Sequence, residues 1–246
     1  APTTIKTNHR TAVKSELSSA TMRVMWSTTF ERFAVGKVVC GAVAVFVEDW
    51  TRPRAGESRI FEQDVLERLG CTKPWVPPAL YVPLSAVLVW LSADKDTRVV
   101  GLLAWYGAGV LAWTLFEYLA HRFSFHHAPA TRRQLVIGYL IHGNHHAFPD
   151  DVRRLTTPVV MTLPIGAAIL GVFLLVLGRP GFGCFAGFMH GYLLYDLVHY
   201  AIHRGALQTP VGRFLRRHHL QHHFLAPHRK FGVTSPLWDV IFRTSR

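Results

Sequence analysis

Four long apolar segments, separated by polar stretches, organise the last two thirds of this chain of 246 residues. Each approaches the roughly 20 apolar residues that a helix needs to cross the hydrocarbon core of a bilayer. We expect these spans near residues 79–93, 99–119, 158–177 and 182–198. Very short polar connections join the first span to the second and the third to the fourth, which predicts two antiparallel helical hairpins. The expected fold class is therefore an all-α integral membrane protein with four transmembrane helices.

The first 76 residues follow a different pattern. Residues 1–33 are basic, rich in Ser and Thr, and hold no early apolar run, so we expect a mobile arm without a secretory signal. The apolar run of residues 34–47 contains Lys37 and is short for a span, which favours an interfacial helix over a further crossing. Residues 61–69 predict a short amphipathic helix that ends at Gly70. The membrane domain then occupies residues 77–246.

Composition supports a membrane protein, because half of the residues are hydrophobic, only 17% are charged and the mean hydropathy is positive. The net charge of +12 comes with no nucleic-acid recognition motif, so it indicates a cytoplasmic face against anionic lipid. Four spans put residues 120–157 and 204–246 on the same side as the amino terminus, and both segments are rich in arginine. The positive-inside rule predicts that both termini are cytoplasmic, at the endoplasmic reticulum of a eukaryote or the inner membrane of a bacterium.

Histidine is concentrated at the polar ends of these spans. The motif HxxHH occurs at residues 142–146 and again at 219–223, and two more widely spaced pairs accompany the two copies. Because positions i, i+3 and i+4 share one face of a helix, we expect each HxxHH copy to direct three imidazoles to one place. The ten candidate metal ligands are His121, His126, His142, His145, His146, His199, His203, His219, His222 and His223. Ten imidazoles exceed the four ligands of a structural zinc site, which favours two metal ions held in a cytosolic helical cap.

The other histidines lack this spacing. We interpret His9, His190 and His228 as ordinary polar side chains, and His127 and His218 as neighbours of the motifs that break their spacing. The ten-histidine set at a membrane surface favours two iron ions that bind and reduce dioxygen, while a purified sample could carry zinc.

Ligand histidines need hydrogen-bond acceptors that fix their tautomer. The candidate acceptors lie close to the histidine motifs in the chain: Glu117, Asp150, Asp151 and Asp196. Small residues repeated every four positions in the fourth span predict close packing of helices instead of chemistry: Gly183, Gly187 and Gly191.

The four histidine motifs together resemble those of the integral-membrane fatty acid hydroxylase and sterol desaturase superfamily. The surrounding residues are similar to those of the fatty acid 2-hydroxylases: Glu117-Tyr118 before the first pair, HGNHH at residues 142–146, Tyr195-Asp196 before His199, and FGVTSPLWD at residues 231–239. This resemblance covers residues from about 75 to 246, and the combined spacing is highly specific.

The resemblance implies an enzyme that inserts a hydroxyl group at carbon 2 of a fatty acyl chain, either free or carried in a ceramide-type lipid. The ten histidines would be the metal ligands, and Tyr192, Tyr195 and Asp196 match positions beside the site, near the substrate head group. Some relatives carry a fused cytochrome b5 domain, whereas residues 1–75 are too short for one and lack its HPGG word. We therefore expect electrons from a separate donor such as cytochrome b5 or a ferredoxin.

Other functions remain compatible with the same ligands. Within the superfamily the alternatives are a sphingoid-base, sterol or carotenoid hydroxylase, or a desaturase. From a different class, the chain could be a membrane metal-binding or transport protein. A transporter, however, needs ionisable residues along a path through the membrane, and His190 is the one mid-span candidate.

Overall fold

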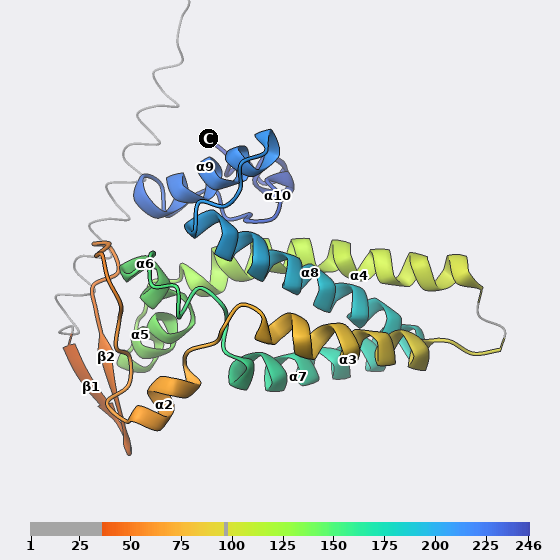
Figure 1. Cartoon of the computed structure of the whole chain (residues 1–246), viewed down its shortest axis with the longest axis horizontal. Coiled ribbons are helices and arrows are strands. Elements are labelled where there is room, and N and C mark those ends of the chain that lie inside the picture. The colour runs from red at the N-terminus through yellow and green to blue at the C-terminus, as the bar shows by residue number, and fades with distance from the viewer. Residues whose placement is uncertain (1–35, 96–97) are drawn as a thin grey trace, which may run out of the picture.

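The structure is a computed structural model that describes residues 36–95 and 98–246, so the predicted arm at 1–33 lies outside the described residues. Four long helices form a bundle: α3 (Val76–Ser92), α4 (Val99–Leu119), α7 (Val159–Leu177) and α8 (Pro180–His203). They coincide with the four predicted apolar segments. Figure 1 shows them running side by side, with the α3–α4 and α7–α8 connections at one end of the bundle.

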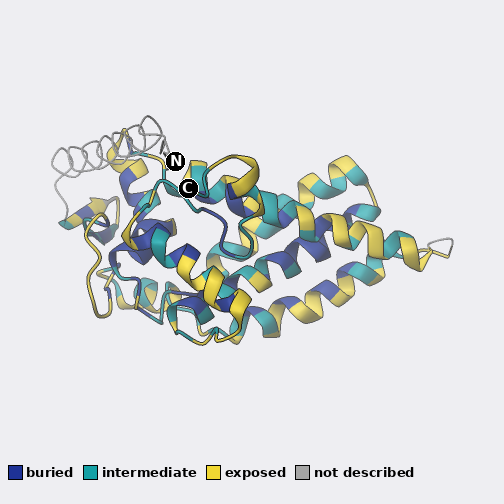
Figure 2. Cartoon of the chain, turned by 90° about the horizontal axis from the view of Figure 1, so that it is seen from above, coloured by how far each residue is buried: buried dark blue, intermediate teal, exposed yellow. Residues whose placement is uncertain are grey.

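Shorter elements form a cap at the opposite end of the bundle (Figure 1). They are α2 (Asp64–Leu69), the π-helical turns η1 (Ala120–Phe125) and η2 (Tyr139–Gly143), α5 (Arg132–Gly138), α6 (Asn144–Ala147), α9 (Pro210–Phe224) and α10 (Leu237–Ile241). The predicted amphipathic helix is α2, and Gly70 ends it as expected. Figure 2 shows buried residues gathered toward the cap, while the far end of the bundle is largely exposed or intermediate.

The predicted interfacial helix at residues 34–47 is wrong. The described part of this segment is an antiparallel hairpin of β1 (Gly36–Cys40) and β2 (Val43–Val47), which turns at Gly41 with φ +62°. Valine occupies much of both strands, and β-branched residues favour a pleated, half-buried surface over a helix. The buried valines of the hairpin pack on Leu135 and Tyr139 of the cap. The fold is therefore mainly helical with one β-hairpin, not all-α.

Glycines let α8 lie directly against its neighbours, as their four-residue spacing predicts. A Cβ atom added to Gly187 would lie 1.9 Å from the Tyr106 carbonyl oxygen of α4. The corresponding distance is 2.7 Å from Gly183 to the Ser92 hydroxyl of α3, and 2.5 Å from Gly191 to the Cβ of Trp113. No side chain fits at these crossings, so the glycines set the helix separation.

Replacing Gly187 with alanine is expected to destabilise the fold by about 1–3 kcal/mol, because the new methyl group overpacks the α4–α8 crossing. Gly107 of α4 is the matched control, since a Cβ there meets nothing within 4 Å. Gly107→Ala should be neutral or slightly stabilising, because alanine favours a helix more than glycine does. Thermal unfolding of both variants in detergent measures the difference. Equal melting temperatures would contradict the close crossing.

Within residues 36–95 and 98–246, two helices are long and apolar enough to cross a membrane: Val99–Phe125, which joins α4 to η1, and α7. None of the residues of α7 is buried in the protein, although the helix is almost entirely apolar. The core helix of a soluble protein would bury such a surface, so its exposure fits a lipid environment. His190 lies inside the bundle, where Tyr106 and Ser85 hydrogen-bond its two ring nitrogens at 2.8 and 3.1 Å. This confirms its interpretation as an ordinary polar side chain.

Candidate metal centre

The ten predicted histidines form two compact groups where the bundle meets the cap. Within each group the five candidate ligand atoms all lie within 4.8 Å of one another. The first group is His121, His126, His142, His146 and His222. The second group is His145, His199, His203, His219 and His223. The structure thus brings together all ten residues, from segments separated by up to about a hundred positions in the chain.

The prediction that each HxxHH copy serves one place is wrong. In the first copy His142 and His146 belong to the first group, whereas His145 belongs to the second. In the second copy, His219 and His223 join the second group and His222 the first. Successive residues point about 100° apart around a helix, so a helix that runs between two sites can supply both. Each HxxHH motif therefore links the two groups.

The Nε2 atoms within each group are spaced like ligands around one ion. His142 Nε2 lies 3.0 Å from that of His121 and 2.9 Å from that of His146. In the second group, His145 Nε2 lies 2.9 Å from the Nε2 atoms of His199 and His223. Two ligand atoms that each lie about 2.1 Å from an ion, at right angles to each other, are about 3.0 Å apart. The donor set therefore fits one ion per group.

Burial keeps these imidazoles neutral. Two causes lower the pKa of His146 to about 3: burial away from solvent, which is the larger, and repulsion from other histidines. The same two causes hold the pKa of His145, His219, His222 and His223 well below the usual value. A neutral imidazole has one free lone pair, which is the form that binds a metal. Imidazole-rich sites suit iron, zinc, copper and nickel.

Backbone carbonyls, not the predicted carboxylates, orient the ligand rings. His121 Nδ1 donates to the Phe231 carbonyl at 2.5 Å, and His222 Nδ1 donates to the Arg229 carbonyl at 2.6 Å. In the second group, His199 Nδ1 lies 3.4 Å from the Leu155 carbonyl oxygen. A hydrogen bond at Nδ1 leaves the Nε2 lone pair free for an ion and fixes the ring orientation.

The predicted carboxylate acceptors bind elsewhere in the described part of the chain. Glu117 accepts hydrogen bonds from the backbone of Val233 and Thr234, and Asp196 Oδ1 accepts one from the Thr157 amide at 3.3 Å. Asp150 shows no hydrogen bond to a histidine among the described residues. Glu117 and Asp196 thus lie near the histidines in sequence, but their hydrogen bonds go to backbone amides and not to the rings.

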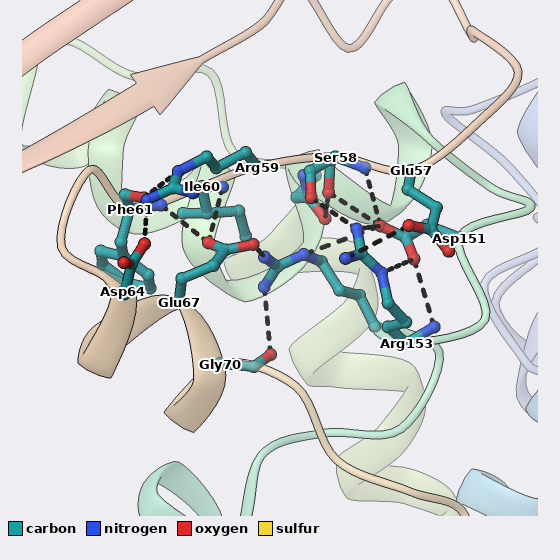
Figure 3. Close-up of polar contacts among 12 residues, drawn as sticks. Glu57, Ser58, Arg59, Ile60, Phe61, Asp64, Glu67, Gly70, Asp151 and Arg153 are labelled. Atoms are coloured by element: carbon teal, nitrogen blue, oxygen red, sulfur yellow. Dashed lines mark hydrogen bonds and ion pairs between the residues drawn. The ribbon is translucent and has the colours of Figure 1, made fainter.

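Asp151 instead joins the cap to the segment before α2 (Figure 3). Its Oδ2 accepts hydrogen bonds from the Ser58 amide at 2.8 Å and from the Ser58 hydroxyl at 3.1 Å, and Arg153 pairs with it. Next to this contact, Arg154 forms an ion pair with Glu67 of α2. This network joins residues 151–154 to the segment before α2 and to α2, and none of these contacts involves a histidine.

Of the three other predicted site residues, Tyr195 contacts the second group. Tyr192 and Tyr195 line a large cavity, and the Tyr195 ring stacks on His199 with centroids 5.6 Å apart and planes 5° apart. The Tyr192 hydroxyl and Asp196 Oδ2 are buried without a hydrogen-bond partner among the described residues. Tyr192 lines the cavity, whereas Asp196 does not.

The other histidines that the structure describes fall outside both groups, as expected. His127 is exposed, and His9 lies outside the described residues. His218 is buried and pairs with Asp239 at 3.0 Å. The sequence interpretation did not include Asp239, although it lies in the FGVTSPLWD word at residues 231–239.

A cavity of about 710 Å³ connects the bundle to both groups. Apolar residues of α3, α7 and α8 line most of it, including Leu88, Leu170 and Phe188. At its inner end it reaches His121 and His142 of the first group and His145 of the second. Such a space suits an extended apolar chain with its polar end at the histidines.

The fold and the two histidine groups are those of a helical, membrane-associated protein. Comparisons with known proteins identify the family. The sequence model described as fatty acid hydroxylase matches residues 106–244. A dihydroceramide fatty acyl 2-hydroxylase of Arabidopsis thaliana is 37% identical over 76% of this chain and 79% of its own. The human fatty acid 2-hydroxylase is 32% identical over 80% of this chain, which spans 59% of that protein.

A solved structure gives the same result. Full-length scs7p, of which only the hydroxylase domain is visible, matches with a TM-score of 0.74 and 31% identity over 80% of this chain and 76% of that chain. The chain belongs to the fatty acid hydroxylase family. It is therefore an enzyme, an oxidoreductase of lipid metabolism.

Proposed function

We propose that this protein hydroxylates carbon 2 of a fatty acyl chain, either free or carried in a ceramide-type lipid. The observation that carries the proposal is the apolar cavity that opens onto histidines of both groups. An acyl chain in this cavity would present its first carbons to the histidines. The names of the plant and human relatives, which are 2-hydroxylases, support this position on the chain.

The proposed metal centre consists of two ions, the first held by the group around His142 and the second by the group around His145. When bound, a pair of iron ions would supply the binding and reduction of dioxygen, and zinc could replace iron in a purified sample. One oxygen atom enters a C–H bond to give the alcohol, and the other leaves as water with two electrons and two protons. The electrons would come from a donor such as cytochrome b5 or a ferredoxin.

The chain's own residues position the substrate. The apolar walls exclude water from the acyl chain and fix its direction. We assign the Tyr192 hydroxyl and Asp196 Oδ2 to the polar head of the substrate, because both are buried and lack a partner among the described residues. Tyr195 would hold the His199 ring in place by stacking on it. All three are proposed site residues.

We also propose that α3, α4, α7 and α8 all span the membrane, with the cap on the cytoplasmic side. Both connections between paired helices lie at the end opposite the cap (Figure 1). The cap carries exposed arginines at Arg204, Arg213 and Arg217, as the positive-inside rule expects. An acyl chain could then enter the cavity from the bilayer, at the endoplasmic reticulum or a bacterial inner membrane.

The direct test uses the purified protein with iron, a reducing donor system, oxygen-18 gas and a defined acyl lipid. Mass spectrometry should find a 2-hydroxy acyl product that carries one labelled oxygen atom. A product altered only in a sphingoid base, sterol or carotenoid would contradict the acyl assignment. Metal flux into proteoliposomes without hydroxylation would favour a transporter. His190 is the mid-span residue that a transport path would use, and hydrogen bonds with Ser85 and Tyr106 already occupy both of its ring nitrogens.

A further inference from the structure

The first histidine group rests on a short loop near the carboxyl end of the chain, residues 229–234, which we term the carbonyl loop. Its Arg229 carbonyl accepts the Nδ1 hydrogen bond of His222, and its Phe231 carbonyl accepts that of His121. Lys230 lies between these two residues with φ +60°. Residues other than glycine seldom adopt this left-handed conformation, and it persists where surrounding contacts enforce it.

Asp239 of α10 is the main contact that holds the carbonyl loop. Its side chain is fully buried, and it accepts hydrogen bonds from the Phe231 amide at 2.9 Å and the Gly232 amide at 2.8 Å. His218 Nε2 and the Thr244 hydroxyl donate to the same carboxylate at 3.0 and 2.7 Å. Four donors leave little of its acceptor capacity unused. A carboxylate, which only accepts hydrogen bonds, therefore suits a position surrounded by four donors.

Glu117 holds the other end of the carbonyl loop. This buried carboxylate, at the cap end of α4, accepts hydrogen bonds from the Val233 amide at 2.6 Å and the Thr234 amide at 3.0 Å. Lys230 is fixed separately, because its amide donates to the Thr244 carbonyl and its Nζ donates to the Ser245 carbonyl. The loop is thus anchored on both sides of the two carbonyls that face the histidines.

The second histidine group makes no hydrogen bond to the carbonyl loop among the described residues. Among the described residues, Nδ1 of His145, His219 and His223 is buried without a hydrogen-bond partner, and His199 faces Leu155. Disturbing the loop should therefore affect one group and leave the other unchanged.

We propose that Asp239 is a positioning residue for the first metal ion, acting through the carbonyls of the loop, with His218 fixing the Asp239 carboxylate. This inference rests on the proposed two-ion centre. Loss of Asp239 would free the Phe231 and Arg229 carbonyls to move away from His121 and His222. Both rings would then lose the contacts that fix their tautomer and direction.

The test measures bound metal in the purified full-length chain, loaded with iron or zinc and then challenged with a graded chelator. Asp239→Asn keeps the size of the side chain but puts an amide donor against backbone and His218 donors. We expect one of the two ions to bind about 10- to 100-fold more weakly, as for other residues that orient ligands. The metal content should fall from two ions per chain to one.

Asp151→Asn is the matched control, because Asp151 is an equally buried carboxylate of the cap that bonds Ser58 and not the loop. It should retain two ions. Lys230→Gly should also retain two, since glycine adopts positive φ freely, whereas Lys230→Val should lose one. These substitutions separate loop geometry from general damage to the fold, which thermal unfolding monitors in parallel.

Retention of both ions by Asp239→Asn, or loss of both ions together at the same chelator concentration, would overturn the inference. Loss of one ion in Asp151→Asn as well would also overturn it. A wild-type chain that binds no metal at all would instead refute the proposed centre itself. The two failures are therefore distinguishable.

Discussion

Replacing His222 or His219 with alanine is expected to lower acyl 2-hydroxylation more than about 100-fold, since even residues that only orient ligands contribute about 10- to 100-fold. The two histidines stand three residues apart in one motif, yet they belong to different groups. Each substitution should therefore weaken a different ion. If both ions are needed, both variants should be inactive, and each should lose one ion first under chelator challenge. Product analysis and metal counting measure these effects.

His127→Ala is the control for this experiment. His127 directly follows His126, a member of the first group, but its side chain is exposed and belongs to neither group. The variant should keep full activity and two ions. Activity in His219→Ala close to that of the wild type would contradict the assignment of the second group to the reaction. A large loss of activity in His127→Ala would show that histidines outside the two groups are also required, which would contradict the assignment by group.

Replacing Gly166 with phenylalanine is expected to reduce hydroxylation of long acyl chains by about 10- to 100-fold, because misplacing a substrate by about 1 Å can cost this much. Gly166 lines the cavity on α7, and a Cβ there meets only the Phe185 ring at 3.7 Å. A benzyl group would extend from this open position into the space for the chain. Met161, near the cap end of α7, also lines the cavity, and Gly166 lies five residues, roughly 7.5 Å, farther from the cap along the helix (Figure 1). Shorter chains should therefore be affected less.

The same substitution at Gly171 tests the cavity specifically. Gly171 lies on the same helix, but it does not line the cavity, and a Cβ there meets nothing within 4 Å. Gly171→Phe should keep the activity and the chain-length preference of the wild type. Both variants should retain two metal ions. An unchanged chain-length profile in Gly166→Phe would show that the acyl chain lies elsewhere.

The helices of the bundle were predictable because length and apolarity are local properties of a sequence. The hairpin at residues 36–47 was not predicted, since a short apolar run fits a strand or a helix equally well by hydropathy. Its valines favour a strand because they can pack against the surface that Leu135 and Tyr139 of the cap provide. The sequence alone does not reveal that surface.

The membership of the two histidine groups, taken together, was predictable, but the division between them was not. Spacing identified all ten histidines, because few other roles need imidazoles at intervals of three, four and five residues. Which residue joins which group depends on where a helix passes between the sites, as His145 and His146 demonstrate. The orienting acceptors were also missed, since the carbonyls of Arg229 and Phe231 carry no side-chain signature. Asp239 lies in the recognisable FGVTSPLWD motif, but the motif alone did not indicate what this residue does.

The most direct test of this account is an experimental structure of the metal-loaded protein with anomalous diffraction data collected at the absorption edge of the metal. We expect two peaks, one in each group of five histidines, with each ion about 2.0–2.1 Å from the Nε2 atoms that bind it. A single peak, or peaks away from the two groups, would contradict the two-ion centre.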